Sequence, residues 1–163
     1  MDNHYFGFEK DFVEDGLRCI PMVVRMKLDA VGIKMSLRQW SQLGEYQRVK
    51  LATMPVKTKT NREDYSAYLC SGIAATCDEP VVRMAIPPFA EWKDKDCIPT
   101  GLQEQAAKFK MPLLPEAWKN LRPLQRYALV KLSRPGHENR NFPFAMAEFG
   151  LTTKKEGLCA EPI

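Results

Sequence analysis

The chain has 163 residues, of which 45% are hydrophobic and 27% charged, and its formal net charge is +4. These proportions are typical of a globular protein large enough to bury a core, and they exclude a disordered or fibrous chain. Basic and acidic residues are interleaved along the sequence, so nucleic acid is not an expected partner. No stretch approaches the roughly 18 apolar residues of a membrane span, and residues 1–15 lack the order of a signal peptide.

The five cysteines are odd in number and scattered, and no Asn-x-Ser/Thr acceptor occurs. This usage favours free thiols in a reducing compartment, either the cytoplasm or a plastid stroma. Cys19 and Cys97 are expected to be buried among apolar side chains, although they could instead meet at a two-fold axis. Cys159 is expected to be exposed in a tail, and no disulfide or metal is predicted.

The first half of the chain is predicted to begin with an extended arm and to continue with four helices. Residues 5–12 alternate apolar and polar side chains, which favours an extended arm laid against the core. The helices are expected over residues 21–31, ending at Gly32, over 37–43 and 45–53, separated by Gly44, and from the capping box Thr60–Glu63 onward.

A proline-rich connector over residues 78–96 is predicted to follow, with Phe89 and Trp92 holding it against the body. Three more helices are expected over residues 99–109, 115–121 and 123–132. A final helix is expected to be capped by Asn141 and to end at Gly150, before a flexible tail over 151–163.

The chain also repeats itself without gaps at a spacing of 78 residues. Eight of the 36 aligned pairs between residues 19–54 and 97–132 are identical, including Cys19 with Cys97 and Trp40 with Trp118. Unrelated segments of this length would share about two. We therefore predict one all-α domain over residues 1–150 with two similar three- to four-helix halves, an internal duplication, and both tryptophans buried.

The helix-start signals of the two copies agree although their chemistry differs. Ser36 and Gln39 form a capping box in the first copy, whereas Pro115 occupies the first helical position in the second. Glu45 is likewise matched by Pro123. The arginines at the start of these helices, Arg48 and Arg126, are expected to have specific carboxylate or carbonyl partners and a structural role.

The common catalytic and metal-binding motifs are missing. There is no glycine-rich phosphate loop, Cys-x-x-Cys, His-Glu-x-x-His or Gly-x-Ser-x-Gly, and the only histidines are His4 and His137. No cofactor is therefore expected, and the protein is not predicted to be an enzyme.

One segment, residues 131–142, favours a binding role. It follows a helix that is apolar almost all round, so its base should be rigid, and Pro135-Gly136 predicts a turn among mixed polar side chains. The alternative is a hydrated loop whose asparagines only cap the last helix.

The sequence resembles the nitrate reductase-associated proteins of the NarM type over roughly residues 5 to 149. The residues that carry the resemblance are Phe6-Gly7-Phe8-Glu9, Leu17 to Met22, Lys27-Leu28-Asp29, Gly32-Ile33-Lys34, Pro123 to Arg126, Lys131 to Pro135 and His137 to Phe142. Members accompany assimilatory nitrate reductase, a molybdenum and iron–sulfur enzyme, in cyanobacteria, other bacteria and some algae. The resemblance implies a small accessory factor that this enzyme needs to become active, with no catalysis of its own.

The predicted partner-binding residues are Arg134, His137, Glu138, Asn139 and Arg140 of the loop, with Arg18 and Arg25 expected nearby. Arginine suits carboxylate or phosphate oxygens. Two alternatives are a DNA-binding regulator, because the helices around Gly44 imitate a helix-turn-helix, and a small enzyme that uses His137 and Glu138 as an acid–base pair.

Overall fold

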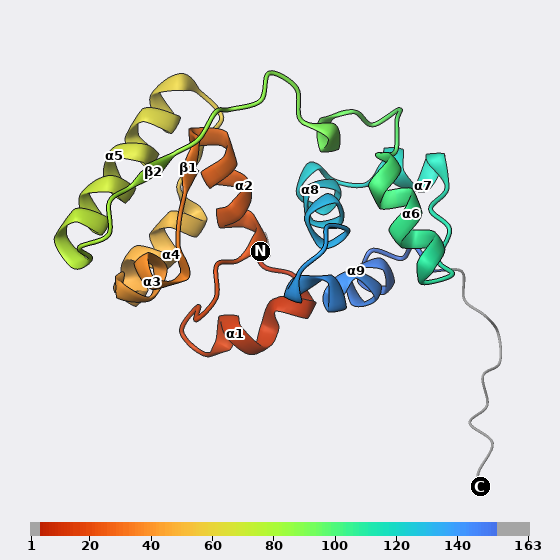
Figure 1. Cartoon of the computed structure of the whole chain (residues 1–163), viewed down its shortest axis with the longest axis horizontal. Helices are drawn as coiled ribbons and strands as arrows, with labels where there is room; N and C mark the ends of the chain where they lie inside the picture. Colours follow the sequence, from red (N-terminus) through yellow and green to blue (C-terminus); the bar gives the residue numbers. More distant parts are fainter. Residues whose placement is uncertain (1–3, 153–163) are drawn as a thin grey trace, which may run out of the picture. The chain divides into compact units, whose positions relative to one another are not determined.

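The protein is helical apart from two short strands, as the computed structural model of residues 4–152 shows (Figure 1). This confirms the predicted all-α class. The chain divides into two compact units, Met1–Ala90 and Glu91–Ile163, and each is described by itself. The predicted tail beyond residue 152, with Cys159, lies outside the described residues.

The first unit packs four helices, α2 to α5, and a small sheet around Trp40, Leu51, Tyr65 and Leu69, which are almost completely buried. Strands β1 and β2 are antiparallel, with Ile33 opposite Arg83. In chain order its elements are the 3-10 helix η1 (Gly7–Glu9), α1 (Lys10–Glu14), α2 (Met22–Val31), β1 (Ile33–Lys34), α3 (Leu37–Gln42), α4 (Glu45–Thr53), α5 (Lys59–Thr76) and β2 (Val82–Arg83).

The predicted extended arm is wrong, because residues 7–14 form η1 and α1. The cause is Glu9, whose side chain is buried although the alternating pattern placed it outside. Its carboxylate accepts hydrogen bonds from the backbone N–H of Phe6, at 3.0 Å, and of Met22, at 2.7 Å. A carboxylate at the start of α2 satisfies an N–H that the helix leaves free.

The second unit is built around α8, whose side chains are buried along most of its length. Trp118, Tyr127 and Phe142 fill its core. In chain order its elements are the 3-10 helix η2 (Glu91–Lys93), α6 (Thr100–Lys108), α7 (Pro115–Asn120), α8 (Pro123–Leu132), the 3-10 helix η3 (His137–Asn141) and α9 (Phe142–Glu148).

Three helices of the first unit begin 78 residues before three helices of the second. These pairs are α2 with α6, α3 with α7, and α4 with α8. The predicted capping box of Ser36 and Gln39 and the prolines at the starts of α7 and α8 are confirmed. Gly32, directly after α2, and Lys110, at the matching place after α6, both have left-handed backbones, with φ of 67° and 54°. The common origin of the two segments stays a hypothesis.

Three predictions for other segments are wrong. Helix α5 begins at Lys59, two residues early, because Thr58 and Asn61 form a capping box in place of Thr60 and Glu63. The side chain of Phe89 is 62% exposed and does not hold the connector. Cys19 is half-buried and Cys97 is exposed, since Cys97 precedes α6 on a surface loop.

Each unit holds a buried tryptophan and a nearby arginine that bond to main-chain carbonyls. In the first, Trp40 Nε1 donates to Leu17 O at 2.7 Å, and Arg48 donates to Gly16 O and Leu43 O at 2.7 and 3.0 Å.

In the second unit, Trp118 Nε1 donates to Asp94 O at 2.9 Å. Arg126 donates to Trp92 O and Leu121 O at 2.8 and 2.6 Å. Both tryptophans are completely buried, as predicted, and both arginines have the expected structural role. The carbonyl of Trp92 thereby anchors the end of the connector, and its ring packs edge-on against Tyr127 with centroids 5.9 Å apart, which agrees with the predicted role of Trp92.

Arg126→Met should lower the free energy of unfolding by about 2 kcal/mol, because two carbonyls would lose their donors in a buried place. Urea unfolding followed by circular dichroism measures this change. Arg122→Gln, which alters an exposed arginine four residues earlier, is the control and should change stability by less than about 0.5 kcal/mol. If Arg126→Met and Arg122→Gln both changed the free energy of unfolding by the same small amount, water would satisfy the carbonyls of Trp92 and Leu121.

Lys27 gives the first unit a pH-dependent stability. Its ammonium group donates to Ala52 O, at 2.6 Å, near the end of α4. Burial lowers the pKa of Lys27 to about 8, whereas a lysine in an unfolded chain titrates at about 10.4. Between these values the unfolded chain binds more protons, so raising the pH favours the folded state.

We therefore expect the wild-type protein to gain stability relative to Lys27→Met as the pH rises from about 7.5 to 9.5. Comparing the two proteins by urea unfolding across this range cancels the contributions of the other titrating groups. A difference that stays constant with pH would mean that the Lys27 ammonium group is as well solvated as in the unfolded chain.

Candidate functional site

The predicted loop, residues 131–142, lies between the buried helix α8 and the buried side chain of Phe142. The ring of Phe142 packs against Phe109, with ring centroids 5.6 Å apart. At the turn, Gly136 has a φ of 152°, a conformation that side-chain-bearing residues rarely adopt. The loop therefore begins and ends at buried side chains, which agrees with the buried base that the sequence predicted.

Asn139 holds the loop from within. Its amide oxygen accepts from the side chain of Gln105, on α6, and its amide nitrogen donates to Arg134 O at 3.3 Å. Both ends of the Asn139 amide are therefore used inside the second unit, and the predicted partner-binding role of Asn139 stays a prediction.

The expected capping of the last helix by the Asn141 side chain is wrong. Asn141 occupies the position before α9 but makes no capping bond with its side chain. Helix η3 runs directly into α9, and the N–H of Phe142 bonds to Asn139 O. Continuous helical backbone leaves no free N–H group at that point for a side chain to cap.

The loop presents two exposed cations. Arg134 and Arg140 have exposed side chains, and neither makes a side-chain hydrogen bond or ion pair with the described side chains, which leave out those of His137 and Glu138. His137 and Glu138 lie in η3, but their side chains are outside the described part of the structure. Free guanidinium groups on a rigid base can bind carboxylate or phosphate oxygens.

The other two predicted site residues belong to the first unit. Arg18 is exposed and pairs with Asp15 at 3.0 Å, and Arg25 donates to Ile20 O at 3.0 Å. Their expected position beside the loop stays a prediction.

The described residues contain no group of three or more His, Cys, Asp or Glu side chains that could hold a metal ion. Within residues 4–152, no helix has both the length and the apolar character needed to cross a membrane.

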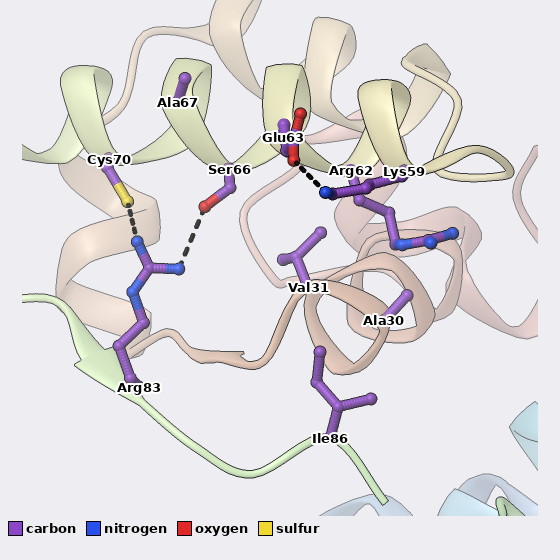
Figure 2. A pocket seen from close by; sticks show the side chains of 10 residues that line it. All are labelled: Ala30, Val31, Lys59, Arg62, Glu63, Ser66, Ala67, Cys70, Arg83 and Ile86. Carbon is purple, nitrogen blue, oxygen red and sulfur yellow. Dashed lines mark hydrogen bonds and ion pairs between the residues drawn. The ribbon is translucent and has the colours of Figure 1, made fainter. Parts of the chain in front are cut away.

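The first unit also contains a groove that no sequence pattern predicted, with a volume of about 480 Å³. Figure 2 shows Arg83 reaching from β2 toward Ser66 and Cys70 of α5. Arg83 donates to Ser66 Oγ at 3.1 Å and to Cys70 Sγ at 3.5 Å. The end of α2, with Ala30 and Val31, also lines the groove.

Gly32 holds the β2 segment in place along this groove. The carbonyl of Gly32 accepts from Met84 N at 2.9 Å. A Cβ on Gly32 would lie 2.7 Å from Met84 O and 3.0 Å from the side chain of Ile86. Because this glycine allows the close approach, it positions Arg83 and Ile86 opposite α5.

Comparison with known protein families matches residues 5–149 to the conserved nitrate reductase-associated proteins. The protein belongs to this family, which confirms the resemblance seen in the sequence. No curated protein and no solved structure matches the chain.

Gly32→Ala should destabilise the protein more than Gly16→Ala. Both glycines have left-handed backbones, with φ of 67° and 63°, but no atom lies within 4 Å of a Cβ built on Gly16. Gly16→Ala should cost about 1 kcal/mol and Gly32→Ala at least about 2 kcal/mol, because only the second adds a clash with backbone. Urea unfolding measures both. Equal losses would show that Met84 can move away freely.

Proposed function

We propose that this protein is an accessory factor that binds an assimilatory nitrate reductase and is needed for that enzyme to become active. In this proposal it has no catalytic activity of its own and acts in the cytoplasm, or in a plastid stroma. The observation that carries the proposal is the family match over residues 5–149, whose description names nitrate reductase as the associated enzyme.

The recognition surface in this proposal is the loop at residues 131–142. Arg134 and Arg140 are exposed cations without an ion pair among the described residues, and the loop starts from a buried helix. An arginine on a rigid base loses little entropy when it binds, and arginines are often the dominant residues of interfaces. The loop therefore suits an acidic patch on the enzyme, or the phosphates of its cofactor before the site closes.

The two alternatives gain less support. The second helix of the suggested helix-turn-helix is α4, and the guanidinium of its Arg48 is bonded to the main-chain carbonyls of Gly16 and Leu43 rather than offered to a DNA groove. An acid–base pair of His137 and Glu138 would need a cleft that holds both side chains, and these side chains lie outside the described part of the structure.

Replacing Arg134, His137 and Arg140 together by Ala should leave the melting temperature nearly unchanged but weaken binding to the nitrate reductase of the host. Substitutions at the surface usually alter the free energy of unfolding by about 0.5 kcal/mol or less. Removing an arginine from an interface often weakens the free energy of binding by about 2 kcal/mol or more. Co-purification of the tagged variant with the enzyme, and the nitrate reductase activity of the host, measure the loss. Asn139 is kept because it holds the loop from within.

Lys108→Ala and Lys110→Ala, two changes at exposed lysines of the same unit, serve as the matched control. Growing the host with and without molybdenum shows whether formation of the complex depends on how much of the nitrate reductase contains its molybdenum cofactor. A triple variant that folds normally and supports full nitrate reductase activity would exclude the loop as the recognition surface. Failure of the unaltered protein to co-purify under either condition would contradict the proposed function itself.

A further inference from the structure

We propose that the groove between α5 and the β2 segment is a second docking site, which binds an acidic, extended segment of a partner protein. A carboxylate of that segment would pair with Arg83, and an apolar side chain beside it would pack on Ile86 and Val31. This inference goes beyond the proposed function, which assigns recognition to a loop in the other unit.

The charges around the groove are mainly positive and favour the binding of an anion. Its lining includes Lys59, Arg62 and Arg83 but only one carboxylate, that of Glu63, which lies 3.7 Å from Lys59. Arg62 donates to the backbone carbonyls of residues 56 and 57, at 3.2 and 3.0 Å. Neither arginine has a carboxylate partner among the described residues.

Arg83 in particular is held by neutral groups. Its two bonds go to a hydroxyl and to a thiol, and sulfur is a weak acceptor, so the positive charge is poorly compensated. Other arginines of the same unit do find carboxylates: Arg38 pairs with Asp78 and Glu79, and Arg18 with Asp15. The Ser66 and Cys70 bonds fix the direction of the Arg83 guanidinium, which leaves further N–H groups for an incoming carboxylate.

The groove also has an apolar part beside Arg83. It is lined by Ala30, Val31, Ala67 and Ile86, and the side chain of Ile86 is 56% exposed. Exposed apolar residues that adjoin one another commonly mark an interaction site. A small anion would cover only the arginine end of this surface, whereas a peptide with an acidic and an apolar side chain would cover both ends.

An array of labelled eight-residue peptides tests the proposal on the whole chain. Each peptide carries one Glu or Gln next to one Leu, Phe or Ala, and this pair is moved through all positions of the peptide. Fluorescence anisotropy then gives the affinity of the peptides that bind most tightly. The best Glu peptides should bind at least about tenfold more tightly than their Gln counterparts, because a charge-assisted pair is lost. If no Glu peptide binds more tightly than its Gln counterpart, the proposal is overturned.

Variants of the groove arginines then locate the site. Arg83→Gln and Arg62→Gln should each weaken the best Glu peptide by about tenfold, whereas Arg122→Gln, at an exposed arginine of the other unit, should leave its affinity unchanged. Affinities that are unchanged in both groove variants would overturn the proposal. The Glu-to-Gln comparison on the unaltered protein remains decisive if a variant fails to fold.

Cys70 offers an internal reporter, because it lines the groove, and Cys77 is its matched control. Both thiols are half-buried, and Cys77 lies seven residues further along at the end of α5. Bound peptide should slow the alkylation of Cys70 by iodoacetamide, measured by mass spectrometry at each site, and leave Cys77 unaffected. Binding without protection of Cys70 would overturn the proposed position.

The loop variant with Arg134, His137 and Arg140 replaced should bind the peptide as the unaltered protein does. This result separates the two proposals, because loss of nitrate reductase binding would then leave the groove site standing. A loss of peptide binding in that loop variant would place the peptide on the loop and overturn the groove as its site.

Discussion

Each unit depends on hydrogen bonds that a buried tryptophan and an arginine donate to main-chain carbonyls. Trp40 and Arg48 hold the backbone at Gly16 and Leu17, while Trp118 and Arg126 hold the backbone before α6. A carbonyl that leaves water must find a donor, and an arginine near the start of a helix faces an unfavourable dipole. Each guanidinium points away from the start of its helix and donates to these carbonyls, so the carbonyls gain donors and the arginine gains acceptors that offset the dipole.

This arrangement ties irregular segments to the helices beside them by side-chain hydrogen bonds. The segments that precede α2 and α6 have few backbone bonds of their own, and the tryptophan–arginine pairs supply the missing donors. Helices α4 and α8 are consequently held to these segments as well as to the core, through Arg48 and Arg126. A polar loop that follows α8 can then keep its shape without burying its own charged groups, and a site that is already ordered loses less entropy on binding.

The candidate loop could be predicted and the groove could not, for a physical reason. The loop is one continuous segment, so an apolar helix, a Pro-Gly turn and several polar residues in succession are visible in the sequence. The groove combines the end of α2, the face of α5 and the β2 segment. Gly32 and Met84, 52 positions apart, bring these parts together through one backbone hydrogen bond, and no local pattern encodes that contact.

The sequence by itself determined the helices whose ends depend on neighbouring residues. The capping box of Ser36 and Gln39 and the prolines at positions 115 and 123 act within one turn, so their positions predicted the helix starts. Only the tertiary structure decided the helical course of residues 7–14, the β1–β2 pairing and the exposure of Cys97. These depend on partners distant in the chain, as with the Glu9 carboxylate and the N–H of Met22, and short-range patterns cannot report the energy of such contacts.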